Sequence, residues 1–115
     1  MLRQVLKSQI HHALISEAAP DRESGIEIPT DLVDAVGLCD GEKVQVESIT
    51  TGNRLETCVQ AGDPRTGRII LGGGAARVIT RGERVTITAI GLSHEPVLPQ
   101  KVELNERNEI ARTGA

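Results

Sequence analysis

Polar and apolar residues alternate along several short segments of the chain, with a period of two residues. That period is the one expected for a β-strand with one buried face. It predicts strands at residues 26–28, 44–49, 54–60, 68–71 and 83–90. Gly, Asp, Asn and Pro cluster between these segments, which is typical of turns.

The first segment, residues 2–15, fits two different periods. Its residues alternate loosely, but Leu6, Ile10 and Leu14 also have a helical spacing. Periodicity alone therefore leaves helix and strand open, and we favour a long strand. Strict alternation along such a strand would place the neighbouring residues His11 and His12 on opposite faces.

Residues 29–37 have the features of a short helix. Thr30 can cap its N-terminus, Asp31 lies at the positive end of the helix dipole, and Gly37 can end it. Further along, three successive glycines at 72–74 would let the backbone approach another group closely. Short strands at intervals of eight to twelve residues, with one or two short helices, predict a mainly β protein that forms a small β-barrel.

Length and composition limit the organisation of the chain. The 115 residues, with a mass of 12.3 kDa, are enough for one domain with one modest core. We expect a single domain over residues 1–115, with a weakly alternating tail at 93–115 that becomes mobile from about residue 105. The chain has no Phe, Tyr or Trp, so its core must be aliphatic.

Charge argues against two classes of partner. Thirteen Lys and Arg residues against sixteen Asp and Glu residues leave a net charge of −3. This balance gives no electrostatic reason to expect binding to nucleic acid or to an anionic membrane. No apolar run approaches the ~20 residues that a membrane-spanning helix needs, and charge interrupts the start of the chain too early for a signal peptide. We expect a cytoplasmic protein.

A few residues could carry chemistry. Arg54 and Cys58 share a parity in one predicted strand and so would share a face; an arginine there can bind a carboxylate or simply form an ion pair. Cys58 could transfer a proton or act as a nucleophile, but a lone cysteine in an apolar strand is often buried and inert. Two adjacent histidines on opposite faces cannot easily bind one metal, and no cluster of Asp and Glu nearby completes a site, so we expect no metal.

Several motifs together resemble the aspartate 1-decarboxylase family. The motifs are Met1-Leu2-Arg3, Leu6-Lys7-Ser8, Ile10-His11, Glu17-Ala18, Leu32-Val33-Asp34-Ala35, Gly41-Glu42-Lys43-Val44-Gln45-Val46, Thr51-Gly52-Asn53-Arg54-Leu55-Glu56-Thr57, Ala61-Gly62 and Gly73…Ala75-Ala76-Arg77. The resemblance implies a small double-psi β-barrel and a homotetramer with active sites between subunits. It also implies self-cleavage at a Gly-Ser bond, which converts the serine to a pyruvoyl group. That group decarboxylates aspartate to β-alanine for pantothenate biosynthesis.

The chain departs from the family pattern at the positions that matter for this chemistry. Ser24-Gly25 stands where the family has Gly-Ser, so residue 25 has no hydroxyl from which a pyruvoyl group could form. Gln9 replaces the lysine that would pair with the substrate's second carboxylate, which argues against aspartate as the substrate. Family tyrosines are replaced at positions 22 and 58, and the family asparagine at position 72 is glycine. The family residues that remain are His11, Arg54, Thr57, Gly73 and Ala75.

These departures lead to three hypotheses. The favoured one is an enzyme without a cofactor that acts on a small carboxylate by acid–base chemistry in a specialised pathway. Its substrate-binding residues would be Arg54, Gly73, Gly74, Ala75 and Gln9, and its catalytic residues His11, Cys58 and Thr57. The second is a true decarboxylase that cleaves Glu23–Ser24 instead and forms pyruvoyl from Ser24. The third is a catalytically inactive scaffold or regulatory partner. Residues 26–46 also resemble the swapped-hairpin motif of small DNA-binding regulators, but the acidic balance argues against DNA.

Overall fold

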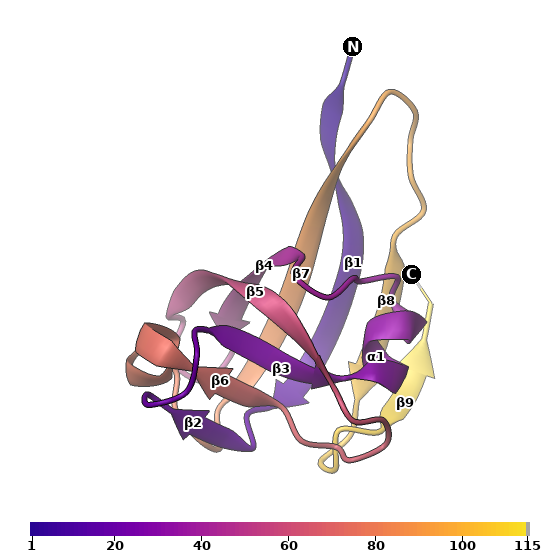
Figure 1. Cartoon of the computed structure of the whole chain (residues 1–115). Helices are drawn as coiled ribbons and strands as arrows, with labels where there is room; N and C mark the ends of the chain where they lie inside the picture. Colours follow the sequence, from indigo (N-terminus) through magenta and orange to yellow (C-terminus); the bar gives the residue numbers. More distant parts are fainter. Residues whose placement is uncertain (115) are drawn as a thin grey trace.

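Strands make up most of the computed structural model, which describes residues 1–114, and within that range they join into one nine-stranded sheet (Figure 1). The elements in chain order are β1 (Arg3–Leu14), β2 (Glu17–Ala19), β3 (Gly25–Pro29), α1 (Thr30–Ala35), β4 (Lys43–Ser48), β5 (Arg54–Gly62), β6 (Ile70–Gly72), a 3₁₀ helix (Gly73–Arg77), β7 (Arg84–Ser93), β8 (Gln100–Leu104) and β9 (Ile110–Thr113). The strand order is β2-β6-β3-β5-β4-β7-β1-β8-β9. The mainly β prediction is confirmed, and the curved, mixed sheet is consistent with a small double-psi β-barrel.

The ambiguous first segment is a strand, as favoured from the sequence. β1 pairs antiparallel with β7 along most of its length and parallel with β8 at its centre. Its apolar residues Ile10 and Ala13 are fully buried, as is Ile15 just beyond its end. Two strand partners and a buried face explain why β1 does not form a helix, although its spacing would also allow one.

The helix α1 is shorter than its pattern predicts and starts differently. Thr30 was expected to be the N-cap, but that position belongs to Pro29, and no side chain caps the helix. The predicted end is confirmed: Gly37 has a left-handed backbone with φ of +70°. The amides of Gly37 and Leu38 donate hydrogen bonds to carbonyls of the last turn, the pattern of a Schellman motif.

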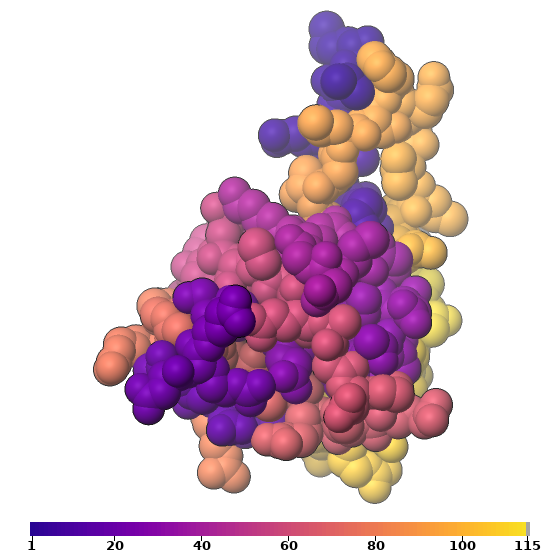
Figure 2. Space-filling view, in the orientation of Figure 1, coloured from indigo at the N-terminus to yellow at the C-terminus, as the bar shows by residue number. Residues whose placement is uncertain are grey.

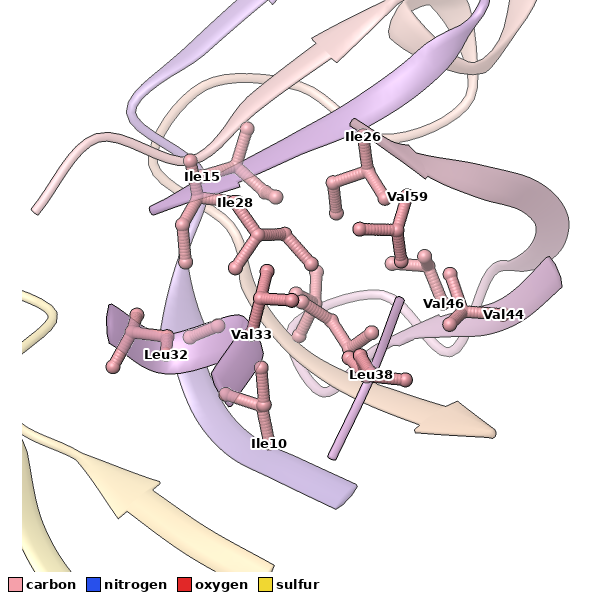
Figure 3. Close-up of a cluster of buried hydrophobic side chains, with 14 of the residues drawn as sticks. Ile10, Ile15, Ile26, Ile28, Leu32, Val33, Leu38, Val44, Val46 and Val59 are labelled. Atoms are coloured by element: carbon pink, nitrogen blue, oxygen red, sulfur yellow. The ribbon is translucent and has the colours of Figure 1, made fainter. Parts of the chain in front are cut away.

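The core is aliphatic, as the absence of aromatic residues requires. Isoleucine, valine and leucine side chains from β1, β3, α1, β4 and β5 meet between the helix and the strands (Figure 3). The largest side chains with less than 2% exposure are Ile10, Ile15, Ile26, Ile28, Leu32, Ile69, Leu71, Ile79 and Ile87, followed by Val36, Val44 and Val46. Branched side chains with few rotamers fill this space without the large rings that most cores use.

One carboxylate is buried beside this core. Glu83 is 9% exposed, and its two oxygens accept hydrogen bonds from the Ser48 hydroxyl at 2.6 Å and from the Thr80 amide and hydroxyl at 2.8 and 3.0 Å. Burial alone would raise the pKa of Glu83, but these hydrogen bonds and a longer one from Thr51 outweigh it and hold the pKa below its usual value. The charged carboxylate therefore joins β4 to the start of β7.

The weakly alternating tail contains two strands that its pattern did not predict, β8 and β9. Asn108, buried and with φ of +57°, fastens the turn between them to the barrel. Its amide group accepts a hydrogen bond from the Leu14 amide at 2.8 Å and donates to the Leu14 and Gly67 carbonyls at 2.9 Å each. Ala115, the end of this tail, lies outside the described residues.

An arm extends from one end of the molecule, so that its principal dimensions are 41 × 27 × 26 Å. It consists of the N-terminal part of β1, the C-terminal part of β7 and the loop that follows (Figures 1 and 2). Its exposed side chains include Met1, Leu2, Leu92 and Leu98. None of the helices in residues 1–114 has the length and apolar character needed to cross a membrane.

Candidate functional site

A row of polar side chains crosses five neighbouring strands of the sheet, β5, β4, β7, β1 and β8. Arg54 on β5 is directly opposite Glu47 on β4, which in turn is opposite Thr86 on β7. The Thr86 hydroxyl lies 2.8 Å from His11 Nδ1, and His11 on β1 is paired with Glu103 on β8. Adjacent strands are about 4.8 Å apart, so this row extends over roughly 19 Å.

Arg54 lies at one end of the row and forms an ion pair. Its guanidinium donates to the Glu47 carboxylate at 2.5 Å, and both side chains are about half exposed. The ion pair that the sequence left open as the simpler interpretation is therefore present. A guanidinium has five N–H donors, so Arg54 can still bind a second carboxylate beside Glu47.

The prediction that His11 and His12 face opposite sides is wrong. The register between β1 and β7 shifts after Ile10, so that two histidines oppose the single residue Thr86. His12 has a φ of +62°, which turns its side chain to the same side as that of His11. Their ring centroids are 4.1 Å apart. The buried residues on either side of this bulge, Ile10 and Ala13, are three positions apart instead of two.

Glu103 completes a cluster with these two histidines. One potential ligand atom from each of His11, His12 and Glu103 lies within 4.8 Å of the other two. Desolvation and the neighbouring His12 lower the pKa of His11, while the Glu103 carboxylate raises it less strongly, so the pKa stays below 6.5. The sequence shows no cluster of Asp and Glu near the histidines, but parallel pairing with β8 brings one carboxylate, Glu103, beside them.

A pocket of about 450 Å³ adjoins this cluster. Gln9, His11, Glu47 and Lys101 are among its lining residues, and Gln9 on β1 is directly paired with Lys101 on β8. The sequence argument against aspartate assumed that glutamine at position 9 leaves a second carboxylate without a cation. Lys101 supplies a cation next to that position, so the argument does not exclude a dicarboxylate.

The glycine loop and the segment at residues 23–25 form a second group, at the other end of the sheet. Gly25 on β3 is paired with Gly72 on β6. A Cβ on Gly72 would overlap the Glu23 carbonyl oxygen, and one on Gly73 would overlap the Ser24 hydroxyl. The predicted close approach of the backbone is confirmed, and it is made by residues 23 and 24. Gly74 is free of such contacts.

Gly25 is enclosed in the same way. A Cβ there would lie 2.6 Å from Gln60 Nε2 and 2.7 Å from its Cδ, and the backbone has φ of +153°. Gln60 Nε2 also donates a hydrogen bond to the Ser24 carbonyl at 3.2 Å. The Gln60 side chain therefore fills the space that a side chain at position 25 would need.

Cys58 belongs to this second group. It is exposed and lines a pocket with Glu23, Ser24 and Gln60. The predicted parity is confirmed, because Arg54 and Cys58 are both on the exposed side of β5. Thr57, the third candidate catalytic residue, points to the opposite face of that strand. Ala75 lies in the 3₁₀ helix and packs partly against the core.

The candidate residues therefore form two groups within one chain. His11 on β1 and Cys58 on β5 line different pockets, and two strands lie between theirs, which corresponds to roughly 14 Å. Sequence reasoning missed five polar residues that complete these groups, namely Glu47, Gln60, Thr86, Lys101 and Glu103. No local pattern distinguished them, because each becomes important through a residue on another strand.

The comparisons with known proteins identify the family. The fold defines a small, mainly β protein consistent with a double-psi β-barrel. The family model for aspartate decarboxylase matches residues 1–111, and the chain belongs to this family. It is 38% identical to an aspartate 1-decarboxylase of Caldicellulosiruptor saccharolyticus, over 97% of the chain and 91% of that protein.

Other relatives give the same result. The chain is 40% identical to an aspartate 1-decarboxylase of Bacillus cytotoxicus, over 96% of the chain and 90% of that protein. It is 48% identical to one of Corynebacterium efficiens over 76% of the chain, an alignment that spans 64% of that protein. The family resemblance read from the sequence is confirmed.

Residue 25 cannot form the pyruvoyl group that the family resemblance implies at this position. Residue 25 has no hydroxyl, and Gln60 fills its side-chain space. The alternative bond, Glu23–Ser24, does have a hydroxyl on its C-terminal side. Within residues 1–114, however, no backbone or side-chain donor binds the Glu23 carbonyl oxygen, which would have to be polarised for attack.

Proposed function

We propose that this protein binds a small carboxylate and acts on it by acid–base chemistry without a pyruvoyl group. The observation that carries the proposal is the enclosure of Gly25. Gln60 occupies the space beside it and binds the Ser24 carbonyl, so this segment is packed around a residue without a side chain.

Carboxylate binding is assigned to the polar row. Arg54 offers free N–H donors beside Glu47, and Lys101 lines the pocket next to Gln9. Within the described residues Lys101 makes no ion pair, so its charge is available to an anion. Arg54 and Lys101 lie at opposite ends of the row, roughly 19 Å apart across the sheet, so a small substrate carboxylate would use one of these two cations.

Proton transfer is assigned to His11. Because burial and His12 lower its pKa, His11 is mostly neutral at pH 7 and can accept a proton. Its Nδ1 is held by the Thr86 hydroxyl, which orients the ring. Cys58, which lies in the second group beside the glycine loop, would be the other proton-transfer residue.

A complete site requires a second copy of the chain. The two groups of candidate residues are separated within one chain, and a homotetramer with sites between subunits would bring the row of one copy to the glycine loop of another. The exposed apolar arm offers surface for such contacts. Analytical ultracentrifugation should give a mass of four times the 12.3 kDa chain; a monomer at the concentrations used for assay would contradict this part of the proposal.

The first experiment is intact mass spectrometry of freshly purified protein under denaturing conditions. We expect one uncut chain of 115 residues. Two fragments split at Glu23–Ser24, with the larger one carrying the mass change for conversion of Ser24 to pyruvoyl, would overturn the proposal. The protein would then be a pyruvoyl-dependent decarboxylase, and β-alanine formation from aspartate would confirm it.

The second experiment measures carboxylate binding directly. Titration calorimetry with succinate and with acetate compares a dicarboxylate with a monocarboxylate. Arg54→Gln should weaken binding at least about tenfold, since a hydrogen bond to a charged group contributes about 1.5–3 kcal/mol. Arg68→Gln is the matched control, because Arg68 forms a similarly exposed ion pair with Glu17 at 2.9 Å and lines neither the pocket of His11 nor that of Cys58. If neither carboxylate binds, the scaffold hypothesis replaces this one.

A further inference from the structure

The side chains of His11, His12 and Glu103 meet on the outer face of β1 and β8, each with a potential ligand atom within 4.8 Å of the others. We propose that these three residues bind a divalent transition-metal ion, with Zn²⁺ the first candidate. Two imidazoles and one carboxylate are a ligand set that zinc takes in open, exchangeable sites. This proposal does not depend on the function proposed above.

The backbone is specifically arranged to bring the two histidines together. Adjacent residues of a regular strand point to opposite faces, so they cannot bind one ion. Here a bulge in β1 and the left-handed backbone of His12 place both rings on one side. A positive φ is uncommon for a residue other than glycine and carries a cost in conformational energy. The Arg84 guanidinium holds the bulge by donating to the His12 carbonyl at 3.0 Å.

The partner of His11 fixes which of its nitrogens can bind an ion. When Nδ1 carries the proton and donates it to the Thr86 hydroxyl, at 2.8 Å, Nε2 has a free lone pair. Metal-binding histidines commonly have their second nitrogen held in this way. Thr86 is thus a positioning residue for the proposed site.

Glu103 is available as the third ligand. Within residues 1–114 its carboxylate makes no hydrogen bond and no ion pair, although it is only partly exposed. It lies between two pockets, one with His11 and Lys101 and the other with His12 and Arg84. These pockets leave room for water or an anion on the ion, so the site would have an open coordination position.

The geometry needs only small adjustments to accept an ion. In a tetrahedral zinc site, two ligand atoms that each bind the ion at about 2.1 Å are about 3.4 Å apart. Ligand atoms that lie within 4.8 Å of one another therefore have to close by up to about 1.4 Å, which side-chain rotation allows. With an ion bound, His11 would serve as a ligand and not as a free base.

Titration calorimetry of the full chain tests this site. The protein, without an affinity tag, is freed of metal with a chelator and titrated with Zn²⁺ at neutral pH. We expect one ion per chain. Glu103→Gln and His12→Asn should each weaken binding at least about 100-fold, because even changes outside the ligand shell cost about 10–100-fold. Thr86→Val, which keeps all three ligands, should weaken it about tenfold.

Controls separate a lost ligand from a lost fold. Asparagine tolerates the positive φ at position 12, and glutamine has the shape of Glu103, so both variants should keep the circular dichroism spectrum of the parent. His94→Gln removes the other histidine, which lies in an exposed loop, and should leave binding unchanged. Absence of Zn²⁺ binding, or binding that persists in Glu103→Gln and His12→Asn, would refute the proposal. No carboxylate is present in the titration, so its result is independent of the proposed function.

Discussion

Replacing Gly25 by alanine tests whether this segment is packed around a missing side chain. The added Cβ would lie 2.6 Å from Gln60 Nε2 and 2.7 Å from its Cδ, closer than real carbon contacts allow. The overlap forces the flexible Gln60 side chain to shift and give up its hydrogen bond to the Ser24 carbonyl, which should cost about 1–2 kcal/mol. The φ of +153° should add about 1–2 kcal/mol for any residue with a side chain. We therefore expect Gly25→Ala to cost about 2–4 kcal/mol.

Gln60→Ala separates these two contributions. Alone it removes the hydrogen bond to the Ser24 carbonyl, for a loss of about 1 kcal/mol. Combined with Gly25→Ala it also removes the overlap, so the two changes should be less than additive by about 1–2 kcal/mol. The backbone contribution remains in the double variant.

Urea unfolding of the four proteins in this cycle measures the effect. In thermal unfolding, a loss of 2–4 kcal/mol corresponds to a drop in Tm of about 8–16 °C for a domain of this size. Gly74→Ala is the control, because a Cβ there meets nothing within 4 Å; it should change stability by less than about 0.5 kcal/mol. Additive effects within about 0.5 kcal/mol, or a Gly25→Ala protein as stable as the parent, would refute the packing argument.

Four further predictions concern polar groups that are buried or partly buried. Glu83→Gln should lower the free energy of unfolding in urea by about 2–3 kcal/mol, because the amide nitrogen that replaces one carboxylate oxygen cannot accept a hydrogen bond. Glu56→Gln is the control: it alters an exposed ion pair and should cost less than about 0.5 kcal/mol. Folding lowers the pKa of the Glu83 carboxyl below its ordinary value of 4.5. The charged carboxylate should therefore stabilise the fold above pH 4.5, and this stabilisation should be lost as the pH falls through the folded-state pKa. If the parent and the Glu83→Gln protein lose stability equally on acidification, this reasoning is wrong. Asn108→Ala should lower the free energy of unfolding by about 2–4 kcal/mol, because it removes three hydrogen bonds at a buried site. The variant's C-terminal tail should also be cleaved faster by a protease than that of the parent; equal cleavage would argue against a role of Asn108 in holding β9. In NMR, His11 should titrate below 6.5 and lower still in Glu103→Gln, which removes the nearby negative charge; an upward shift would show that the assigned cause is wrong.

Part of the secondary structure, and the family, could be predicted from the sequence alone. Alternation of polar and apolar residues depends on neighbours along the chain, so it located β3, β4, β5 and β7 and the shared exposed face of Arg54 and Cys58. The glycine triplet predicted a close backbone approach for the same reason, since only residues without side chains permit it. The motifs that resemble the aspartate decarboxylase family predicted the fold. The family match over residues 1–111 confirms the family resemblance.

Only the tertiary structure decided how the polar residues group. The bulge that brings His11 and His12 together arises from a register shift against β7, which no local pattern marks. Glu103 and Lys101 reach β1 through parallel pairing with β8, a strand from a tail whose alternation is too weak to predict it. Strand pairing joins residues that are far apart in the chain, and a pattern with a period of two carries no information about which strand lies beside which.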